Sequence, residues 1–394
     1  WPAPLAITKG ETTTMGARRS HSARPWRAIG LAAGVGGGLL ALVLLTVWLL
    51  GRGDTGKPGN SQVIAGIPLP APPSGDNLAH TGSPSPAVTP DPAAAAVARP
   101  GLGLSVPATA EDAFDAVPPV AIVEPLADAP VAALLEVVAG QTLPRTGSDG
   151  RQAWQVYARP FDRKDERPRV ALIIGGLGLS RTATEAAIAR LPGAITLAFD
   201  AYADDAAAWT RSARRNGHET LVSLPLQAGD FPFRDLGPRT LQLTAGAAAN
   251  LRRLNEILAL APGAVGVLAI GGSEFNRSIA AASPILKAIK ARGLMLADTT
   301  SLAGGTSLLP LAAKLNVPRL DVDVMLDDVL DAAAIDARLQ RLEQLARQRS
   351  VAVGLGQPLP LTFARIQAWA ETSTAAGIVL APATAIVDRQ QASR

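Results

Sequence analysis

The chain has 394 residues, a formal net charge of +4 and no cysteine. It is long enough for one large domain or two small ones, and the lack of cysteine excludes disulfides, thiolate metal sites and a cysteine nucleophile. Much of the positive charge lies in an N-terminal cluster, and no later stretch combines Lys and Arg with interleaved aromatic residues. We therefore expect no nucleic-acid partner.

Near the N-terminus, four arginines precede the apolar run Ala28–Leu50, which has a tryptophan close to each end. About 23 apolar residues are enough to cross a bilayer, and the basic flank should stay in the cytoplasm. A cleaved signal peptide is the alternative, but the run is longer than a usual signal core and lacks a small-x-small site at its end. We expect a single-pass inner-membrane anchor. The arginines are Arg18, Arg19, Arg24 and Arg27, and the tryptophans are Trp26 and Trp48.

The anchor divides the chain into unequal parts. Residues 1–27 are expected to form a cytoplasmic basic N-terminus, with Met15 a candidate for the true start. Residues 51–150 are rich in Pro, Ala, Gly and Ser and predict a disordered linker followed by a transitional segment, because such a composition cannot bury a core. Residues 151–388 are expected to form a periplasmic domain, with a tail at 389–394.

Strand and helix patterns alternate from Arg169 onward, which is typical of a parallel sheet with right-handed crossovers. About eight strands within roughly 220 residues favour a distorted or incomplete (β/α) barrel, although an open sheet has the same periodicity. The expected strands are 170–174, 195–199, 221–225, 265–270, 294–297, 320–324, 351–355 and 378–380, and the expected helices are 182–190, 204–216, 247–260, 279–292, 307–315, 332–347 and 362–376.

The first of these strands runs into a glycine-rich turn, at Gly175, Gly176 and Gly178. Thr182 and Glu185 then have the spacing of a capping box. The turn imitates a dinucleotide fingerprint, but Arg181 occupies the third glycine position, so we expect neither a nicotinamide nor a flavin. No cofactor of any kind is expected.

Aspartates follow the later strands, where a barrel places catalytic groups. Asp298, Asp323 and Asp327 are the candidate catalytic residues. Each is also in a position to cap a turn or a helix. We favour a functional role for Asp298, which ends a strand at the active face of the predicted barrel.

Seven segments occur in order between about Trp154 and Val387: RVALIIGGLGLS, RLPGAITLAF, NGHETLVSLPLQ, PGAVGV…GGSEF, RGLMLADTTS, VPRLDVDVMLDD and GLGQPLP. Through these segments the region resembles the divergent polysaccharide deacetylase family, a set of bacterial envelope proteins. The resemblance implies a distorted (β/α) barrel of the glycoside hydrolase/deacetylase type. In active relatives of that fold, one Asp and two His hold a divalent cation that activates water against an N-acetyl group.

This sequence departs from the family pattern at the implied metal ligands. Gly175 and Gly176 replace an Asp pair, while Ser223, Ile270 and Gln357 replace histidines. We therefore expect no metal site and predict a pseudo-enzyme. Five residues at the predicted rim are candidates for substrate binding: Gly175, Gly176, Gly272, Ser273 and Gln357.

Three functions remain open from the sequence. The first is a membrane-anchored periplasmic protein that binds an envelope glycan such as peptidoglycan. The second is a hydrolase or deacetylase that uses the aspartates for acid–base work or for a carboxylate-only metal site. The third is a scaffold for partner proteins in an envelope complex, which an exposed apolar patch would favour.

Overall fold

The structure is a computed structural model that describes residues 110–120 and 124–390. The predicted anchor Ala28–Leu50 and most of the predicted linker lie outside these residues. No helix of the described part is both long enough and apolar enough to span a bilayer.

The core of the domain is a parallel β-sheet, and each of the eight predicted strands is confirmed. The strand order is β8-β7-β6-β5-β4-β3-β10-β9, with β11 paired to β3 outside this path. The predicted strand 320–324 is divided into two short strands, β8 and β9. The bounds are β3 Arg169–Leu177, β4 Thr196–Phe199, β5 Thr220–Leu226, β6 Gly266–Gly271, β7 Met295–Asp298, β8 Arg319–Asp321, β9 Val324–Met325, β10 Val351–Gly356 and β11 Val379–Leu380.

The sheet curls until its two ends meet on one segment. β8 and β9 stand at opposite ends of the strand order, yet only two residues separate them in the chain. Between them, the Val322 N–H donates to the Asp298 carbonyl of β7, and the Asp323 N–H donates to the Val353 carbonyl of β10. The segment 319–325 therefore closes the sheet into a distorted ring, as the barrel prediction requires.

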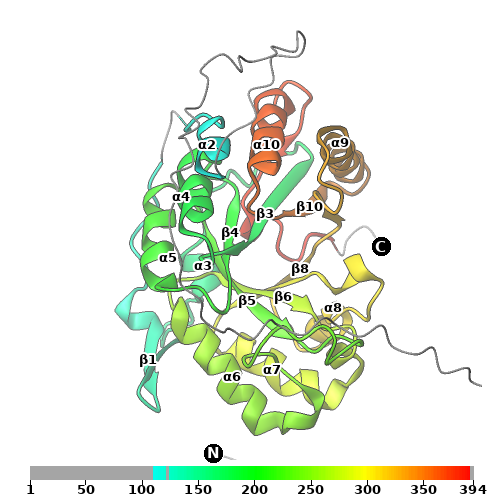
Figure 1. The fold of residues 1–394 in the computed structure, drawn as a ribbon. Helices are drawn as coiled ribbons and strands as arrows, with labels where there is room; N and C mark the ends of the chain where they lie inside the picture. The colour runs from blue at the N-terminus through cyan, green and yellow to red at the C-terminus, as the bar shows by residue number, and fades with distance from the viewer. Residues whose placement is uncertain (1–109, 121–123, 391–394) are drawn as a thin grey trace, which may run out of the picture. The chain divides into compact units, whose positions relative to one another are not determined.

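The helices surround the strands (Figure 1). All seven predicted helices are present, and their bounds agree with the prediction to within a few residues. The helices are α2 Ala110–Asp115, α3 Ala153–Val156, α4 Arg181–Arg190, α5 Ala206–Arg215, α6 Gly246–Leu260, α7 Ile279–Ala291, α8 Leu309–Lys314, α9 Ala332–Arg349 and α10 Pro360–Ser373.

Strand β3 is buried on both faces, which explains its continuous apolar sequence. Val170, Leu172 and Ile174 belong to the cluster that includes apolar residues of α4, α9 and α10. Ala171 and Ile173 belong to the other cluster, with side chains from the remaining strands and from α6 and α7. The alternation follows from the two-residue period of a strand.

The start of α4 differs from the predicted capping box. Ser180 is the N-cap, and its hydroxyl accepts a hydrogen bond from the Ala183 N–H at 3.3 Å. Glu185 forms an ion pair with Arg181 instead of reaching back to the helix start. The prediction failed because Ser180 and Thr182 are both good N-cap residues, and the glycine-rich turn ends at Ser180.

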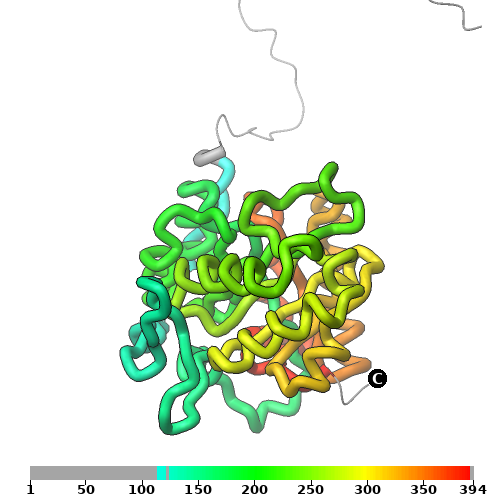
Figure 2. Tube along the Cα trace, turned by 90° about the horizontal axis from the view of Figure 1, so that it is seen from below, coloured from blue at the N-terminus to red at the C-terminus, as the bar shows by residue number. Residues whose placement is uncertain are grey.

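Residues before 151 also contribute to the folded domain. A hairpin of β1 (Leu135–Val138) and β2 (Gln141–Pro144) projects from one side (Figure 2), and Leu143 in β2 is fully buried. Helix α2 packs through Phe114 on Phe363 of α10. The described part of the predicted transitional segment is therefore integral to the domain.

A buried carboxyl group, Glu219, lies just before β5, at the amino-terminal ends of the strands. It accepts hydrogen bonds from the Arg159 N–H and from the hydroxyl and N–H of Thr384. Burial raises the pKa of Glu219 from 4.5 to about 7, against the lowering effect of these hydrogen bonds and of Arg214. The Glu219 side chain thus links the start of β5 to Arg159, which precedes the sheet in the sequence, and to Thr384, which follows β11.

This group predicts a pH-dependent stability. Since the folded-state pKa is raised, the stabilising effect of protonated Glu219 is fully present below pH 4.5 and is lost as the pH rises to about 7. The loss amounts to about 3 kcal/mol of unfolding free energy. Urea titrations across this range should show this loss in the wild type and a smaller one in Glu219→Gln. Equal pH slopes in the two proteins would contradict the assignment.

Candidate functional site

A cavity of about 430 Å³ lies at the carboxyl-terminal ends of β4, β5 and β6. We call it the mouth cavity. It is in the size range of small-ligand sites, and barrels of this kind place their chemistry at this end of the strands. Its lining residues are Leu179, Asp200, Ala201, Tyr202, Pro225, Asp235, Leu236, Gly237, Pro238 and Ile270.

Asp200 directly follows β4 and begins the turn that shapes one wall of the cavity. Its N–H donates to the Leu177 carbonyl at 2.8 Å, which fixes it beside the end of β3. One carboxylate oxygen, Oδ1, accepts from the Tyr202 N–H at 2.9 Å. The other oxygen makes no hydrogen bond to the described protein and can accept one from a ligand.

The opposite wall is a long connection between β5 and α6, residues 227–242, that is fastened to Tyr202. The Tyr202 hydroxyl oxygen accepts from the Arg239 N–H at 2.8 Å, and the Arg239 guanidinium stacks on the ring. Gly237 has a φ of +94°, and a Cβ at this position would lie 2.5 Å from the Tyr202 hydroxyl. Only glycine permits this close approach.

Asp235 brings a second carboxylate to the cavity from this connection. Its Oδ1 accepts from the Gly237 N–H at 2.9 Å. Burial, with added effects of Asp200 and Asp235, raises the pKa of the Tyr202 phenol despite the opposing effect of Arg239. The phenol is therefore protonated at neutral pH, so the cavity offers two carboxylates as acceptors and one hydroxyl as a donor.

Ser273 and Gly272, two of the predicted substrate-binding residues, support this wall. The Ser273 hydroxyl accepts from the Gly229 N–H at 2.8 Å, near the start of the β5–α6 connection. Gly272 has a φ of +83°, and a Cβ there would lie 3.0 Å from the Asn276 amide. Both residues hold the wall in place without lining the mouth cavity.

The other predicted substrate-binding residues lie at the ends of β3 and β10. A Cβ on Gly175 would lie 3.5 Å from Leu355 and 3.7 Å from Leu268, so the barrel interior here is filled by leucines. Gly176 has a φ of +70° and faces Pro358. The exposed Gln357 donates its backbone N–H to Asp327 at 2.7 Å. None of the three lines the mouth cavity.

Asp298 is fully buried and accepts four hydrogen bonds from the loop that follows it. The donors are the N–H and hydroxyl of Thr300, at 3.0 and 2.6 Å, and the Ser307 hydroxyl and Leu308 N–H, at 2.9 and 2.7 Å. The carboxylate thus joins both ends of the loop 299–308. This geometry supports the capping role rather than the chemical role that the sequence favoured.

Asp323 and Asp327 are engaged elsewhere. Asp323 accepts from the Val353 N–H at 2.9 Å and pairs with Arg349 at 3.3 Å. Burial raises its pKa. Asp327 accepts from the Gln357 N–H and the Thr362 hydroxyl, each at 2.7 Å, and its second oxygen is buried without a hydrogen-bond partner. The three predicted catalytic aspartates share no hydrogen-bond partner, and none lines the mouth cavity.

The described residues contain no cluster of three or more His, Asp or Glu side chains that could hold a metal ion. At positions where the resemblance implies histidines, Ser223 is buried within β5 and Ile270 lines the mouth cavity. His218, the single histidine of the described part, is buried before β5, with its ring nitrogens 2.8 and 3.2 Å from the carbonyls of Ile195 and Ile188. It lies away from the mouth cavity and packs as a core residue.

Of the residues that line the mouth cavity, only Ile270 is named from the sequence, as the occupant of a histidine position. Asp200 is recognisable in the sequence as the residue directly after the second predicted strand. Asp235 gave no comparable signal, because it lies in a long irregular connection whose position depends on contacts with Tyr202. A carboxylate directly after a strand, with an aromatic residue two positions later, was the available clue.

The sequence pattern of one known family, described as divergent polysaccharide deacetylase, matches residues 172–387. The chain belongs to this family. Members of the family include proteins whose roles are not described: YibQ of Escherichia coli K12 is 25% identical over 199 residues, and a protein of Haemophilus influenzae is 25% identical over 201 residues. These matches cover 50% and 51% of this chain, but only 61% of YibQ and 70% of the Haemophilus protein.

The crystal structure of an uncharacterized protein, ATU2773 of Agrobacterium tumefaciens C58, has the same fold. It is 34% identical, superposes with a TM-score of 0.60, and the match covers 63% of this chain and all of that one. The family and the fold are thereby confirmed for the region that contains the mouth cavity.

The hydrogen bonds of Asp298 predict a large stability effect. In Asp298→Asn, the amide NH₂ would face hydrogen-bond donors of the loop, such as the Leu308 N–H. Buried donors would then be unpaired, which should lower the free energy of unfolding by about 2–3 kcal/mol. Asp328→Asn is the matched control, because Asp328 is half-exposed in an ion pair with Arg338 and should cost under about 1 kcal/mol. Thermal unfolding measures both. Equal, small shifts would contradict the role of Asp298 as the anchor of its loop.

Proposed function

We propose that this divergent polysaccharide deacetylase is a membrane-anchored periplasmic protein that binds an envelope glycan, such as peptidoglycan, with little or no deacetylation. The apolar run Ala28–Leu50 would be the anchor, and the cationic flank ending at Arg27 would keep the N-terminus in the cytoplasm. The domain would then meet its glycan on the periplasmic side of the inner membrane.

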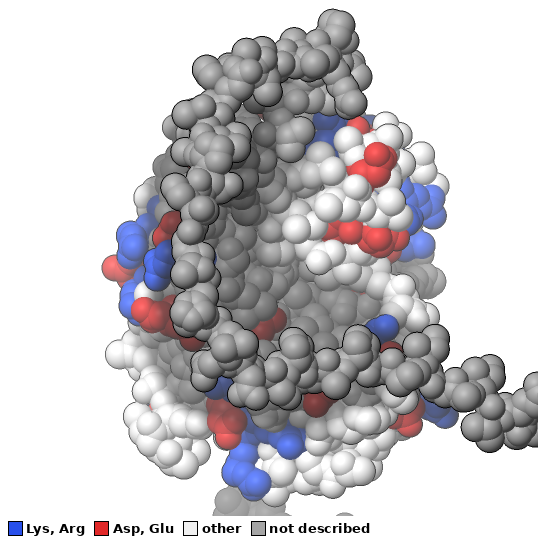
Figure 3. Space-filling view, in the orientation of Figure 1, with Lys and Arg blue, Asp and Glu red and all other residues white. Residues whose placement is uncertain are grey.

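The mouth cavity is the observation that carries the proposal. It combines acceptors on Asp200 and Asp235 with the Tyr202 hydroxyl, at the end of the strands where barrels place their sites. Hydroxyl and amide groups of a sugar match such a set of donors and acceptors. The interspersed acidic and basic side chains on the visible described surface form no basic stripe, which supports leaving nucleic acid out of the proposal (Figure 3).

We propose that deacetylase activity is lost because of the residues that stand at the family's metal-ligand positions. Gly175 and Ile270 have no side-chain atom that can bind a cation. The alternative, a carboxylate-based hydrolase, requires Asp298, Asp323 or Asp327 at the mouth cavity. Their oxygens are instead engaged within the fold or buried, which argues against that alternative.

A second candidate function is a scaffold for partner proteins of the envelope. Large apolar side chains are exposed on loops that follow the strand ends, including Phe233 at 97% and Leu179 at 63% exposure. A protein partner that covered these side chains would bury their apolar surface. The exposed apolar side chains after the strand ends are Leu179, Phe231, Phe233, Val329 and Leu330.

Sedimentation with insoluble peptidoglycan tests the glycan proposal. The wild-type chain should be retained, and Asp200→Asn and Asp235→Asn should each weaken binding by about fivefold or more, since each removes a charged acceptor. Asp328→Asn is the exposed control and should bind normally. If the wild type is not retained, or if Phe233→Ser abolishes retention while Asp200→Asn and Asp235→Asn leave it unchanged, the scaffold function gains over glycan binding. Assays on N-acetylated glycans with added divalent cations should detect no deacetylation.

Reporter fusions test the location. A reporter that is active only in the periplasm should be active when fused after Arg52 and inactive when fused before Arg27, because the arginines upstream of Ala28 oppose translocation. A mature protein that lacks residues 28–50 would instead identify the run as a cleaved signal.

A further inference from the structure

A cavity of about 610 Å³ lies between α9 and the short 3₁₀ helix Thr300–Ala303 that follows β7. We call it the α9 cavity. The segment that closes the ring contributes Asp323, Val324 and Met325 to its lining. The α9 cavity shares no lining residue with the mouth cavity, and its volume is in the range of small-ligand sites. It is therefore a separate candidate site on the same domain.

Helix α9 presents three arginines to this cavity. Arg338, Arg341 and Arg349 line it together with Leu345, and these positions recur at intervals of three or four residues. Such a spacing places side chains on one face of a helix, with neighbouring Cβ atoms about 5–6 Å apart. A small ligand in the cavity can therefore contact Arg338 and Arg341 at the same time.

The positive charge of the α9 cavity is only partly compensated. Arg338 pairs with Asp328 at 2.6 Å, and Arg349 pairs with Asp323 at 3.3 Å. The exposed Arg341 makes neither a hydrogen bond nor an ion pair within the described residues. Three arginines against two aspartates leave the lining with one positive charge in excess.

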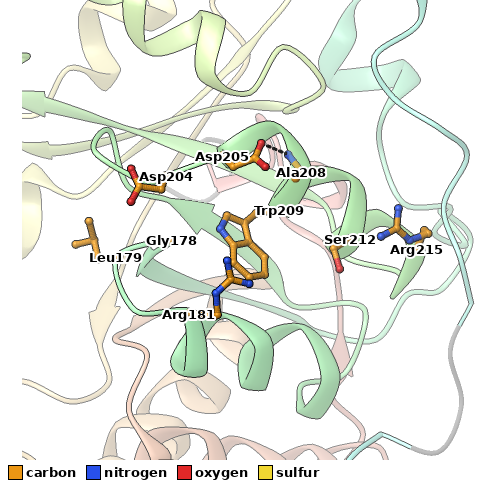
Figure 4. Close-up of a pocket in the computed structure, with 9 residues that line it drawn as sticks. All are labelled: Gly178, Leu179, Arg181, Asp204, Asp205, Ala208, Trp209, Ser212 and Arg215. Atoms are coloured by element: carbon orange, nitrogen blue, oxygen red, sulfur yellow. Dashed lines mark hydrogen bonds between the residues drawn. The ribbon is translucent and has the colours of Figure 1, made fainter.

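A second arginine-lined cavity, of about 360 Å³ between α4 and α5, differs in this respect (Figure 4). We call it the α4–α5 groove. Its two arginines, Arg181 and Arg215, are matched by Asp204 and Asp205. The Arg181 guanidinium also stacks on the Trp209 ring, 5.3 Å from its centre. The groove has no charge excess, so it serves as an internal comparison for the α9 cavity.

We infer that the α9 cavity binds a phosphate monoester through Arg341 and Arg338. A phosphate monoester carries about −1.5 to −2 charges at neutral pH and three acceptor oxygens, enough for two guanidinium groups. The planar fork of arginine matches these oxygens. Arg338 uses Nε and Nη2 for Asp328, while its Nη1 makes no hydrogen bond within the described part of the chain. That group and the whole guanidinium of Arg341 are the donors for the phosphate.

The same cavity offers a surface for the carbon portion of the ligand. Leu302 and Met325 are partly buried side chains that line it opposite the charged groups of α9 in the sequence order of the ring. Apolar contact with these residues would remove carbon surface from water. The chemistry is the same for a soluble phosphate ester and for the headgroup of a phosphatidic acid lipid, and the experiment separates these two sources.

Calorimetric titration of the full chain with glycerol 3-phosphate tests the inference. The wild type should bind it more weakly as salt increases, and should not bind glycerol. Arg341→Gln should weaken binding by about tenfold, because it removes a charged donor. Arg215→Gln is the matched control: it removes another exposed arginine without a partner in the described chain, from the α4–α5 groove, and should change nothing.

A change in the opposite direction is expected for Asp328→Asn. This variant removes the carboxylate that competes with the ligand for the Arg338 fork. Since an exposed ion pair of this kind is worth up to about 1 kcal/mol, binding should become about two- to fivefold tighter. Weaker binding in Asp328→Asn would contradict the role of Arg338 as a donor to the phosphate.

Vesicle binding identifies the source of the phosphate. The full chain is mixed with phosphatidylcholine vesicles that contain or lack phosphatidic acid. A gain with phosphatidic acid that Arg341→Gln loses and Arg215→Gln keeps assigns the site to the lipid headgroup. Binding of glycerol 3-phosphate without such a gain assigns it to a soluble ester. If Arg341→Gln behaves like Arg215→Gln with both probes, or if neither probe binds the wild type, the inference is wrong. Retention on peptidoglycan is a separate measurement, so the proposed function can stand or fall independently.

Discussion

The closure of the sheet by a single segment is the constraint on which the rest of the structure depends. Residues 319–325 bond to β7 through Val322 and to β10 through Asp323, so one extended stretch completes two strand pairings. The buried carboxylate of Asp298 holds the loop that precedes α8, and through it the approach to this segment. The Asp323 carboxylate also accepts from the Val353 N–H of β10, so side chains that look catalytic in the sequence are engaged in holding this segment and the loop before it.

Much of the fold could be predicted because its signals are local. Continuous apolar runs mark strands covered on both sides, and the helices between them are bounded by small or polar residues. The split of 320–324 into β8 and β9 could not be predicted, since it reflects bonding to two different neighbours. The candidate site was harder to predict from the sequence than the fold. Asp298 has the same sequence context whether it caps a loop or binds substrate, and Asp235 meets Asp200 only because Gly237 and Arg239 fit against Tyr202.

The family relationship and the packing of the barrel interior give one consistent account of the proposed pseudo-enzyme. Where the resemblance implies acidic and imidazole ligands, the interior has Gly175 beside Leu355 and Leu268, and Ile270 at the mouth cavity. Replacing buried polar ligands by apolar groups removes a desolvation cost. A barrel without the cation can therefore be as stable as one that holds it. In such a barrel the cavity residues need only bind a ligand and need not support a metal ion.

Helix α2 would have a mechanical consequence if the domain were anchored at its N-terminal side, as proposed. It is attached to the domain by the Phe114–Phe363 ring contact and by the ion pair of Asp115 with Arg190, and it pairs with no strand of the sheet. Tension along the chain would peel α2 away before it reached the hydrogen bonds of the ring. Each residue released would lengthen the tether by about 3.5 Å. The domain would thus gain reach under load while the mouth cavity stayed folded.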